Sequence, residues 1–236
     1  MNFDFFFMLE AMLGAVERIP VTLYIATVSV IVGLVFGLLT ALLRFYEVRI
    51  IAPLLKWVIT LTKGIPVVLL LLVFYIIMVT TYNDFMASLG QNYVFRDFNT
   101  AYIAIAALSV MSSTGMSEAF RGSLTAIDRS QFDAAYAMGL TKRQALGRII
   151  LPQIVPVSIP IVGNLYIGML KGAALASIVS VVDILNGAIL KAGINYRYFE
   201  AYVAAGLVFW GLAVIIEKIF YTIERQSKST LRKSVN

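Results

Sequence analysis

Long apolar segments restrict the fold of this chain more than any other feature. Residues 19–43 are uncharged, and a helix of about 20 apolar residues crosses roughly 30 Å of hydrocarbon. Comparable runs recur along all 236 residues, of which 60% are hydrophobic and 14% are charged. A helix satisfies its backbone hydrogen bonds internally, so it is the structure that such runs adopt in a membrane. We therefore predict a single all-α membrane domain.

The apolar runs predict about five transmembrane helices. Their approximate ranges are 19–43, 57–81, 100–121, 157–181 and 201–222. The fourth range begins late because Pro152, Pro156 and Pro160 interrupt the apolar sequence before it, and proline disrupts a helix interior.

Two pairs of glycines have the GxxxG spacing that permits close packing of membrane helices. These pairs are Gly33 with Gly37 and Gly168 with Gly172. The pattern is frequent in membrane helices and does not indicate which helices meet.

The basic residues indicate the orientation of the chain. They gather after the first run, after the third run and near the C-terminus: Arg44, Arg49, Lys56 and Lys63; Arg121, Arg129, Lys142, Arg143 and Arg148; and Arg225, Lys228, Arg232 and Lys233. Cytoplasmic connections carry such an excess. We therefore expect residues 1–18 to be an external N-terminal segment, residues 19–223 the transmembrane domain and residues 224–236 a basic cytoplasmic tail. The net charge of +6 then needs no nucleic-acid partner.

The composition excludes several kinds of chemistry. The sequence contains neither cysteine nor histidine, which excludes thiol and Ser–His catalysis and the usual zinc sites. We find no paired carboxylates within an apolar run, and this disfavours an intramembrane aspartyl enzyme. The sequence also lacks the phosphate-binding pattern Gly-x-x-x-x-Gly-Lys-Ser/Thr, so ATP that drives this protein must bind to another polypeptide. We expect no metal, no cofactor and no enzymatic activity in this chain.

The polar segment 129–152 carries helix-capping signals between two apolar runs. Ser130 with Asp133 three residues later predicts the N-terminal cap of a short helix. Gly139 predicts the C-terminal end of that helix, where glycine is favoured because it adopts a left-handed conformation.

A second short helix is predicted in the same segment. Thr141 followed by Gln144 has the spacing of a capping box, and Pro152 is expected to end the helix. A connector needs less order than two capped helices provide. We therefore predict that the segment docks onto a partner, although it could also be a solvated connector whose basic residues meet lipid headgroups.

This segment resembles the cytoplasmic loop of permease subunits of type I binding-protein-dependent ABC importers. The residues that carry the resemblance are Asp133, Ala134, Ala135, Gly139, Ile149, Leu151 and Pro152. The family's consensus begins with glutamate where this chain has Asp133, and the other residue types and spacings agree.

Three other segments resemble the polar amino acid uptake permeases. They are Thr62–Pro66, Glu118–Gly122, and Gly163-Asn164 followed by Leu170-Lys171. With the loop, the resemblance covers roughly residues 15–225. It implies that the chain has the type I permease fold and crosses a bacterial cytoplasmic membrane several times.

The resemblance also implies a function and a set of partners. The chain would be the membrane-spanning subunit of an ATP-driven importer, translocating a polar amino acid or close derivative delivered by an extracytoplasmic binding protein. ATP and Mg would bind to a separate ATPase subunit, and a second permease subunit, identical or homologous, would complete the channel. An alternative is an ATP-independent secondary carrier or channel, for which we find no internal duplication.

The resemblance implies that this loop couples the permease to the ATPase subunit. Its first short helix would insert into a groove of the ATPase subunit, with Ala134 and Ala135 small enough to seat closely and Gly139 permitting the turn. The other residues expected to take part in the coupling are Asp133, Leu151 and Pro152.

Three residues are candidates for contacts with the substrate: Glu118, Thr114 and Lys171. Charged groups within a membrane usually face a cavity or each other, and the family's matching glutamate lines the translocation cavity. Alternatively, Glu118 pairs with Arg121 three residues later, Lys171 extends towards the interface and Thr114 bonds to its own helix backbone.

The sequence departs from the family where the family has Lys-Asp-Thr-Ser. Here the segment reads Lys171-Gly172-Ala173-Ala174, so one acid and two hydroxyls are missing. We therefore expect a basic substrate such as arginine to be disfavoured. Either the site accepts something less basic or bulkier, or a partner permease supplies the polar groups.

Overall fold

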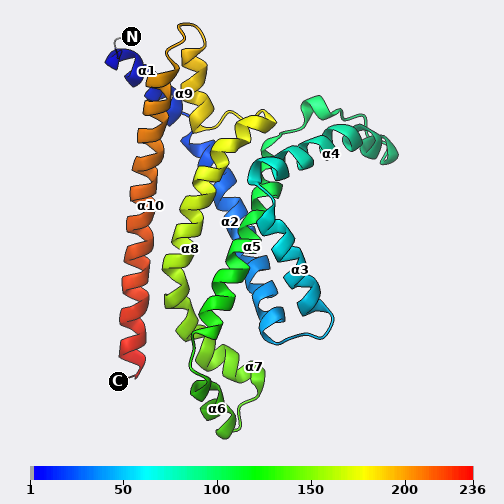
Figure 1. Ribbon diagram of the computed structural model, residues 1–236, viewed down its shortest axis with the longest axis vertical. Helices are drawn as coiled ribbons and strands as arrows, with labels where there is room; N and C mark the ends of the chain where they lie inside the picture. The colour runs from blue at the N-terminus through cyan, green and yellow to red at the C-terminus, as the bar shows by residue number, and fades with distance from the viewer. Residues whose placement is uncertain (1–2, 236) are drawn as a thin grey trace.

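The computed structural model describes residues 3–235, and the side chains of residues 3–229. Regular structure in this range is entirely helical (Figure 1). The elements are α1 (Phe5–Val16), α2 (Ile19–Phe45), α3 (Ile51–Gly64), α4 (Val67–Ser88), the 3-10 turn η1 (Phe95–Asp97), α5 (Ala101–Thr125), α6 (Arg129–Ala137), α7 (Lys142–Ala145), the π-helical turn η2 (Leu146–Ile150), α8 (Leu151–Ala173), the 3-10 turn η3 (Ala174–Val179), α9 (Ile184–Ala192) and α10 (Tyr198–Val235).

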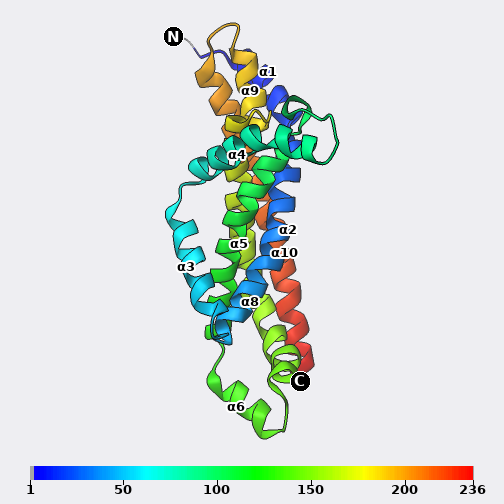
Figure 2. The same cartoon turned by 90° about the vertical axis from the view of Figure 1, so that its right-hand side faces the viewer.

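Within the described part of the chain, five helical segments are long and apolar enough to cross a membrane: Ile19–Phe45, Val67–Ser88, Ala101–Thr125, Lys142–Val179 and Tyr198–Ser229. The prediction of an all-α protein with five candidate membrane spans is confirmed. In Figures 1 and 2, α2, α5, α8 and α10 run along the long axis, whereas α4 projects to one side. α1 and α9 lie at one end of the molecule, and α6 and α7 lie at the other, where α10 also ends.

The second predicted helix, 57–81, is divided in two. α3 ends at Gly64, and α4 begins at Val67 after Ile65 and Pro66, whose ψ angles of 120° and 139° are extended. A proline ring disfavours the helical conformation in the residue before it. Because of this break, α3 is a separate short helix and α4 alone forms the second candidate span.

The fourth predicted helix, 157–181, begins too late, whereas its predicted end is two residues beyond Val179, where the helical segment ends after η3. α8 starts at Leu151, with Pro152 in its first turn and Pro156 and Pro160 inside it, and it ends at Ala173. Proline lacks the N–H that continues the helical hydrogen-bond ladder, and Pro152 lies directly after the π-helical turn η2, where that ladder is already irregular. Further on, Ile154 is buried in a cluster with Ala41 of α2 and Leu124 of α5. This packing holds the proline-containing segment as a helix.

The fifth predicted helix, 201–222, is too short. α10 runs from Tyr198 to Val235, so most of the expected tail, 224–236, continues the helix. An ion pair of 2.6 Å between Lys228 and Glu224, four residues apart, supports this extension. Residues 1, 2 and 236 of the expected terminal segments lie outside the described residues.

α2 and α5 pack closely at the centre of the molecule because α2 presents two glycines to α5. A Cβ atom at Gly33 would lie 2.1 Å from Ser112 Oγ and 2.9 Å from the Ser112 carbonyl carbon. A Cβ atom at Gly37 would lie 2.4 Å from Met116 Cβ. By contrast, Gly168 of α8 has open space where its Cβ would be.

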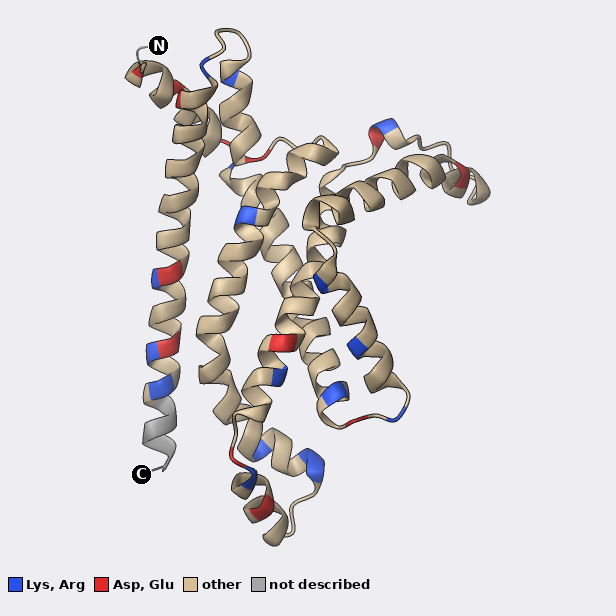
Figure 3. Ribbon diagram, viewed as in Figure 1, with Lys and Arg blue, Asp and Glu red and all other residues tan. Residues whose placement is uncertain are grey.

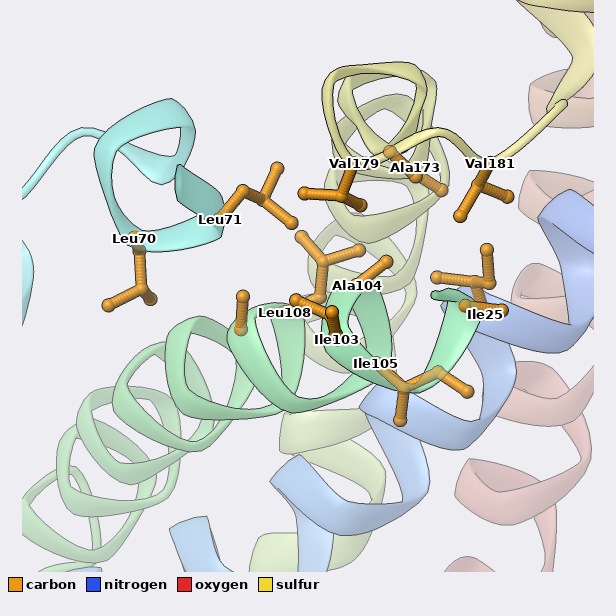
Figure 4. Close-up of a cluster of buried hydrophobic side chains, with 13 residues drawn as sticks. Ile25, Leu70, Leu71, Ile103, Ala104, Ile105, Leu108, Ala173, Val179 and Val181 are labelled. Carbon is orange, nitrogen blue, oxygen red and sulfur yellow. The ribbon is translucent and has the colours of Figure 1, made fainter. Parts of the chain in front are cut away.

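An apolar cluster joins four parts of the chain at one end of this α2–α5 pair. Figure 4 shows Ile25 of α2, Leu71 of α4 and Leu108 of α5 converging with Val179 and Val181 from the segment after α8. Leu71, Leu108 and Val179 are fully buried. This cluster anchors the first turns of α4, although most of α4 is exposed.

The start of α9 is fixed by buried polar groups. The carboxylate of Asp183 accepts hydrogen bonds from the backbone N–H groups of Leu185 and Asn186, and Thr22 Oγ1 of α2 accepts one from Ile184. Asp183 is completely inaccessible to solvent, and burial raises the pKa of its carboxyl group.

Candidate functional site

The loop between α5 and α8 begins with a capped helix. The carboxylate of Asp128 accepts a hydrogen bond of 2.8 Å from the backbone N–H of Ser130, and this bond lowers the pKa of Asp128. The prediction that Ser130 is the N-cap is wrong. α6 begins at Arg129, and the residue directly before it, Asp128, is itself a favoured capping type.

Gly139 ends α6 as predicted. Its φ angle is +78°, a left-handed conformation that costs other L-residues about 1–2 kcal/mol. The N–H of Gly139 donates to the carbonyl of Tyr136, and the N–H of Leu140 donates to the carbonyl of Ala135. This pair of bonds is a Schellman motif, which satisfies carbonyls that the helix end would leave free.

The second short helix also begins as predicted but does not end as predicted. Thr141 and Gln144 form a reciprocal capping box. α7 then continues through the π-helical turn η2 into α8, so Leu151 and Pro152 lie inside one continuous helical segment, Lys142–Val179, and do not end the loop helix.

The two alanines of the loop motif face different environments. Ala135 is fully buried within this chain, so the expectation that both alanines seat against a partner is wrong for Ala135, whose small size serves internal packing. Ala134 and Asp133 are exposed. Two apolar side chains are also exposed nearby, Tyr136 in the last turn of α6 by 40% and Met138, directly after the helix, by 70%. They are additional contact candidates that the sequence motif did not reveal.

α6 is tied to the membrane helices by side chains. The rings of Phe132 in α6 and Phe45 at the end of α2 have centroids 5.8 Å apart, and both belong to a cluster that includes Leu151 of α8. A cleft of about 520 Å³ opens between α6 and the ends of α2 and α5, next to this contact. A displacement of α6 would therefore act on α2 and α8 directly.

Glu118 lies at the centre of a charged cluster formed by α2, α3 and α5. Its carboxylate is 2.6 Å from Arg44 Nη1, 3.3 Å from Lys63 Nζ and 3.2 Å from Arg121 Nη2. The local pair with Arg121 is therefore present. Arg44 and Lys63 were not predicted as partners, because their distance along the sequence gives no sign of proximity.

Of the other two substrate candidates, Thr114 lies one turn before Glu118 on α5, whereas Lys171 lies on α8. Thr114 is buried, and its hydroxyl donates to the carbonyl of Val110, 3.0 Å away on its own helix. Lys171 is exposed on α8, next to Gly172, which lies beside Leu108 of α5. Leu108 and Glu118 are separated by ten residues, about 15 Å along the helix axis. The structure does not bring Glu118 and Lys171 together.

An exposed stripe of α8 carries two polar side chains, those of Asn164 and Lys171, with Gly168 between them. Asn164, Gly168 and Lys171 are exposed and lie on one face of the helix, because residues three and four apart are neighbours. Polar side chains in a membrane-spanning helix usually face a cavity or another protein. The sequence reasoning assigned no role to Asn164, although it follows Gly163 in one of the matching segments.

These features define a multi-span helical membrane protein with a structured loop at one end of its helices. The family model described as "Binding-protein-dependent transport system inner membrane component" matches residues 33–228. The chain belongs to this family, and the resemblance found in the sequence is confirmed.

Relatives cover nearly the whole chain. The "Probable amino-acid permease protein YxeN" of Bacillus subtilis (strain 168) is 32% identical over 97% of this chain and 98% of the relative. The "L-cystine transport system permease protein TcyL" of the same organism is 33% identical over 92% of this chain and 88% of the relative. A solved structure, "Crystal structure of an amino acid ABC transporter with histidines", has a TM-score of 0.80, 26% identity and coverage of 96% and 100%.

The protein is thus a multi-pass inner-membrane permease subunit of a binding-protein-dependent ABC importer. It is the non-catalytic membrane component, and ATP is bound by a partner subunit. Membership of this family implies an ATPase and a binding protein as partners. The alternative of an ATP-independent carrier is replaced by this assignment.

Proposed function

We propose that the importer carries a polar amino acid, or a close derivative, without a strongly basic side chain. The observation that carries this proposal is that permeases named for amino acids match this chain over nearly its full length. Two features oppose a basic substrate. Gly172, Ala173 and Ala174 stand where the resembling permeases have an acid and two hydroxyls. The carboxylate of Glu118 is already matched by three cations.

Uptake by the complete transporter tests this proposal. The chain would be reconstituted in liposomes with its ATPase and binding protein, and ATP-dependent uptake of labelled cystine and glutamine would be compared with that of arginine. We expect uptake of a neutral amino acid and little uptake of arginine. Preferred uptake of arginine, or of a sugar, would overturn the proposal.

We propose that the N-terminal end is external and that the loop and the C-terminal end are cytoplasmic. The excess of basic residues near α6, α7 and the end of α10 supports this orientation, and these elements lie at one end of the molecule (Figure 3). The chain has no cysteine, so a single introduced cysteine is the only thiol of this chain that a maleimide can label. In intact cells, an impermeant maleimide should label Asn195→Cys but not Ser130→Cys. The reverse pattern would invert the orientation.

We propose that α6 docks onto the ATPase subunit. Asp133 and Ala134 are exposed on α6, and Tyr136 and Met138 add apolar surface beside them. Gly139 sets the exit of the helix, while Leu151 and Pro152 transmit its movement into α8. Met138→Cys should therefore form a cross-link with a cysteine in the ATPase groove. Cross-linking from Asn195→Cys instead would contradict the docking.

The contact between Phe132 and Phe45 is proposed to carry movement from α6 to α2. In Phe132→Ala, the ATPase should still bind, because Met138 and Asp133 remain. More ATP should be hydrolysed for each substrate imported, because the link to α2 is weakened. Phe85→Ala on α4 removes an exposed ring of equal size and serves as the control. An unchanged ratio of ATP to substrate in Phe132→Ala would exclude this route.

We propose that a second permease subunit, identical or homologous, covers the exposed polar stripe of α8. Asn164 and Lys171 would be costly in contact with lipid, and they would instead line the substrate path between the subunits. Thr114 and Glu118 would contact substrate only if their present bonds open. Lys63 would be displaced from Glu118 first, because its side chain is 51% exposed. Asn164→Leu should raise the KM for uptake, whereas Ile161→Leu, one turn earlier, should not.

A further inference from the structure

A basic pocket lies between α3 and the ends of α2 and α5, and it extends from the charged cluster around Glu118 to residues that neither the docking nor the substrate path uses, among them Arg49 and Lys56. Its volume is about 760 Å³, and it is lined by two carboxylates and five basic side chains, an excess of three positive charges. The basic residues are Arg44, Arg49, Lys56, Lys63 and Arg121. In Figure 3 the blue segments of α3 and of the α2–α3 connection lie around this region.

The cations of this pocket are incompletely neutralised. Glu118 is shared by three of them. Among the described residues, Arg49 and Lys56 form no ion pair, and the buried Nε of Arg121 has no hydrogen-bond partner. Several donors and an uncompensated charge therefore remain for an anion.

α3 gives the pocket an amphipathic wall. Lys56, Ile59 and Lys63 line the pocket, and they share one face of the helix because they are three, four or seven residues apart. The residues Leu54, Trp57, Val58 and Leu61 have the same spacing on another face and are exposed, Trp57 by 67%. α3 has 14 residues, too few to cross the membrane. An occupant that satisfies both faces is anionic at one end and apolar at the other.

We propose that this pocket binds the phosphate of an anionic phospholipid, with the acyl chains along the apolar face of α3. Basic pockets between membrane helices bind such headgroups, and tryptophan is favoured at the membrane interface. A soluble phosphate or an acidic peptide would leave the apolar face of α3 uncovered. The lipid site does not depend on which substrate is imported.

Quenching of Trp57 fluorescence tests the proposal directly. The chain has two tryptophans, so Trp210→Phe leaves Trp57 as the only one. The full chain would be placed in phosphatidylcholine bilayers that contain a small fraction of either brominated phosphatidylglycerol or brominated phosphatidylcholine. We expect the brominated phosphatidylglycerol to quench Trp57 preferentially. Arg49→Gln with Lys56→Gln should lower this preference by about fivefold for each charge removed, and Glu47→Gln, which removes a carboxylate from the pocket, should raise it.

The matched control is Lys142→Gln with Arg143→Gln, which removes two charges from α7. This variant should keep the preference for the anionic lipid. Equal loss in both double variants would show general surface attraction and overturn the site. Loss of the preference on addition of millimolar inorganic phosphate, at constant ionic strength, would assign the pocket to a soluble anion. Circular dichroism of each variant would establish that a lost preference does not reflect unfolding. Absence of any preference in the Trp210→Phe chain without further changes would refute the proposal.

Discussion

The carboxylate of Glu118 in α5 lies 2.6 Å from Nη1 of Arg44 at the end of α2. The same guanidinium group donates to Ser117 Oγ at 3.3 Å, and only 12% of the Arg44 side chain is exposed. Charge-assisted hydrogen bonds of this length are among the strongest in proteins. This bond holds α2 to α5 at the level where α3 also contributes Lys63.

Loss of Arg44 should destabilise the protein more than loss of Lys63. We expect Arg44→Met to cost about 1.5–3 kcal/mol, because it removes a hydrogen bond between charged groups that are largely shielded from water. Lys63→Met should cost less than about 1 kcal/mol, because half of the Lys63 side chain is exposed. Thermal unfolding in detergent gives the free energies of unfolding. A double-mutant cycle with Arg44→Met, Glu118→Gln and the double variant then gives the coupling energy between Arg44 and Glu118. Equal effects of Arg44→Met and Lys63→Met would contradict the central role of Arg44.

Adding one methyl group at Gly33 should disrupt the α2–α5 packing. Gly33→Ala places Cβ against Ser112, including its backbone, and such overpacking costs about 1–3 kcal/mol. Gly168→Ala is the control: its Cβ has open space, and alanine favours the helix by about 1 kcal/mol. The yield of folded protein and the unfolding temperature should fall only for Gly33→Ala. Ser112→Gly should restore part of the loss, and the absence of any difference between the two glycine variants would exclude this interface.

The conformation of Gly139 should be needed for coupling but not for membrane insertion. Gly139→Pro cannot adopt the φ angle of +78° and loses the N–H that donates to Tyr136, so ATP hydrolysis should be uncoupled from uptake. Gly139→Asn should retain most coupling because asparagine tolerates this conformation. The measurement is the ratio of ATP hydrolysed to substrate imported in proteoliposomes. Normal uptake by Gly139→Pro would show that the loop geometry has no mechanical role.

The buried carboxyl group of Asp183 should make stability depend on pH. Because burial raises its pKa in the folded state, its contribution to stability is complete below the ordinary aspartate pKa and declines as the pH rises through the folded value. Asp183→Asn should remove this decline, and its single amide oxygen should still accept the capping bond from the N–H of Asn186, whereas the bond from Leu185 is lost. Asp183→Ala should lose the cap, at a cost of about 0.5–2 kcal/mol. The measurement is the unfolding temperature of the three proteins across pH 4–8, a range that starts near the ordinary aspartate pKa of about 3.9. Parallel curves for wild type and Asp183→Asn would contradict the predicted role of Asp183 in the pH dependence of stability.

Local signals in the sequence were sufficient for several features. The apolar runs predicted five spans, and the capping box of Thr141 and the left-handed Gly139 were predicted from residue types at fixed spacing. These features depend on interactions within one or two helical turns or with the membrane as a solvent. The same reasoning misplaced the first cap at Ser130, because two capping residues, Asp128 and Ser130, stand close together and only one directly precedes the helix.

Contacts between distant segments were decided by the tertiary structure. The GxxxG pairs are identical as patterns, yet Gly33 and Gly37 meet α5 while Gly168 meets open space. Likewise, Arg44 and Lys63 reach Glu118 from distant parts of the sequence. The packing of Ile154 holds the proline-containing start of α8 as a helix, although the prolines had led us to predict that this helix begins only at residue 157. The sequence by itself determined that there are five apolar helical spans, that α6 ends at Gly139 and that Thr141 caps α7, because those preferences are local. Which helix faces meet depends on the rotation and register of whole helices, and only the packed structure sets these.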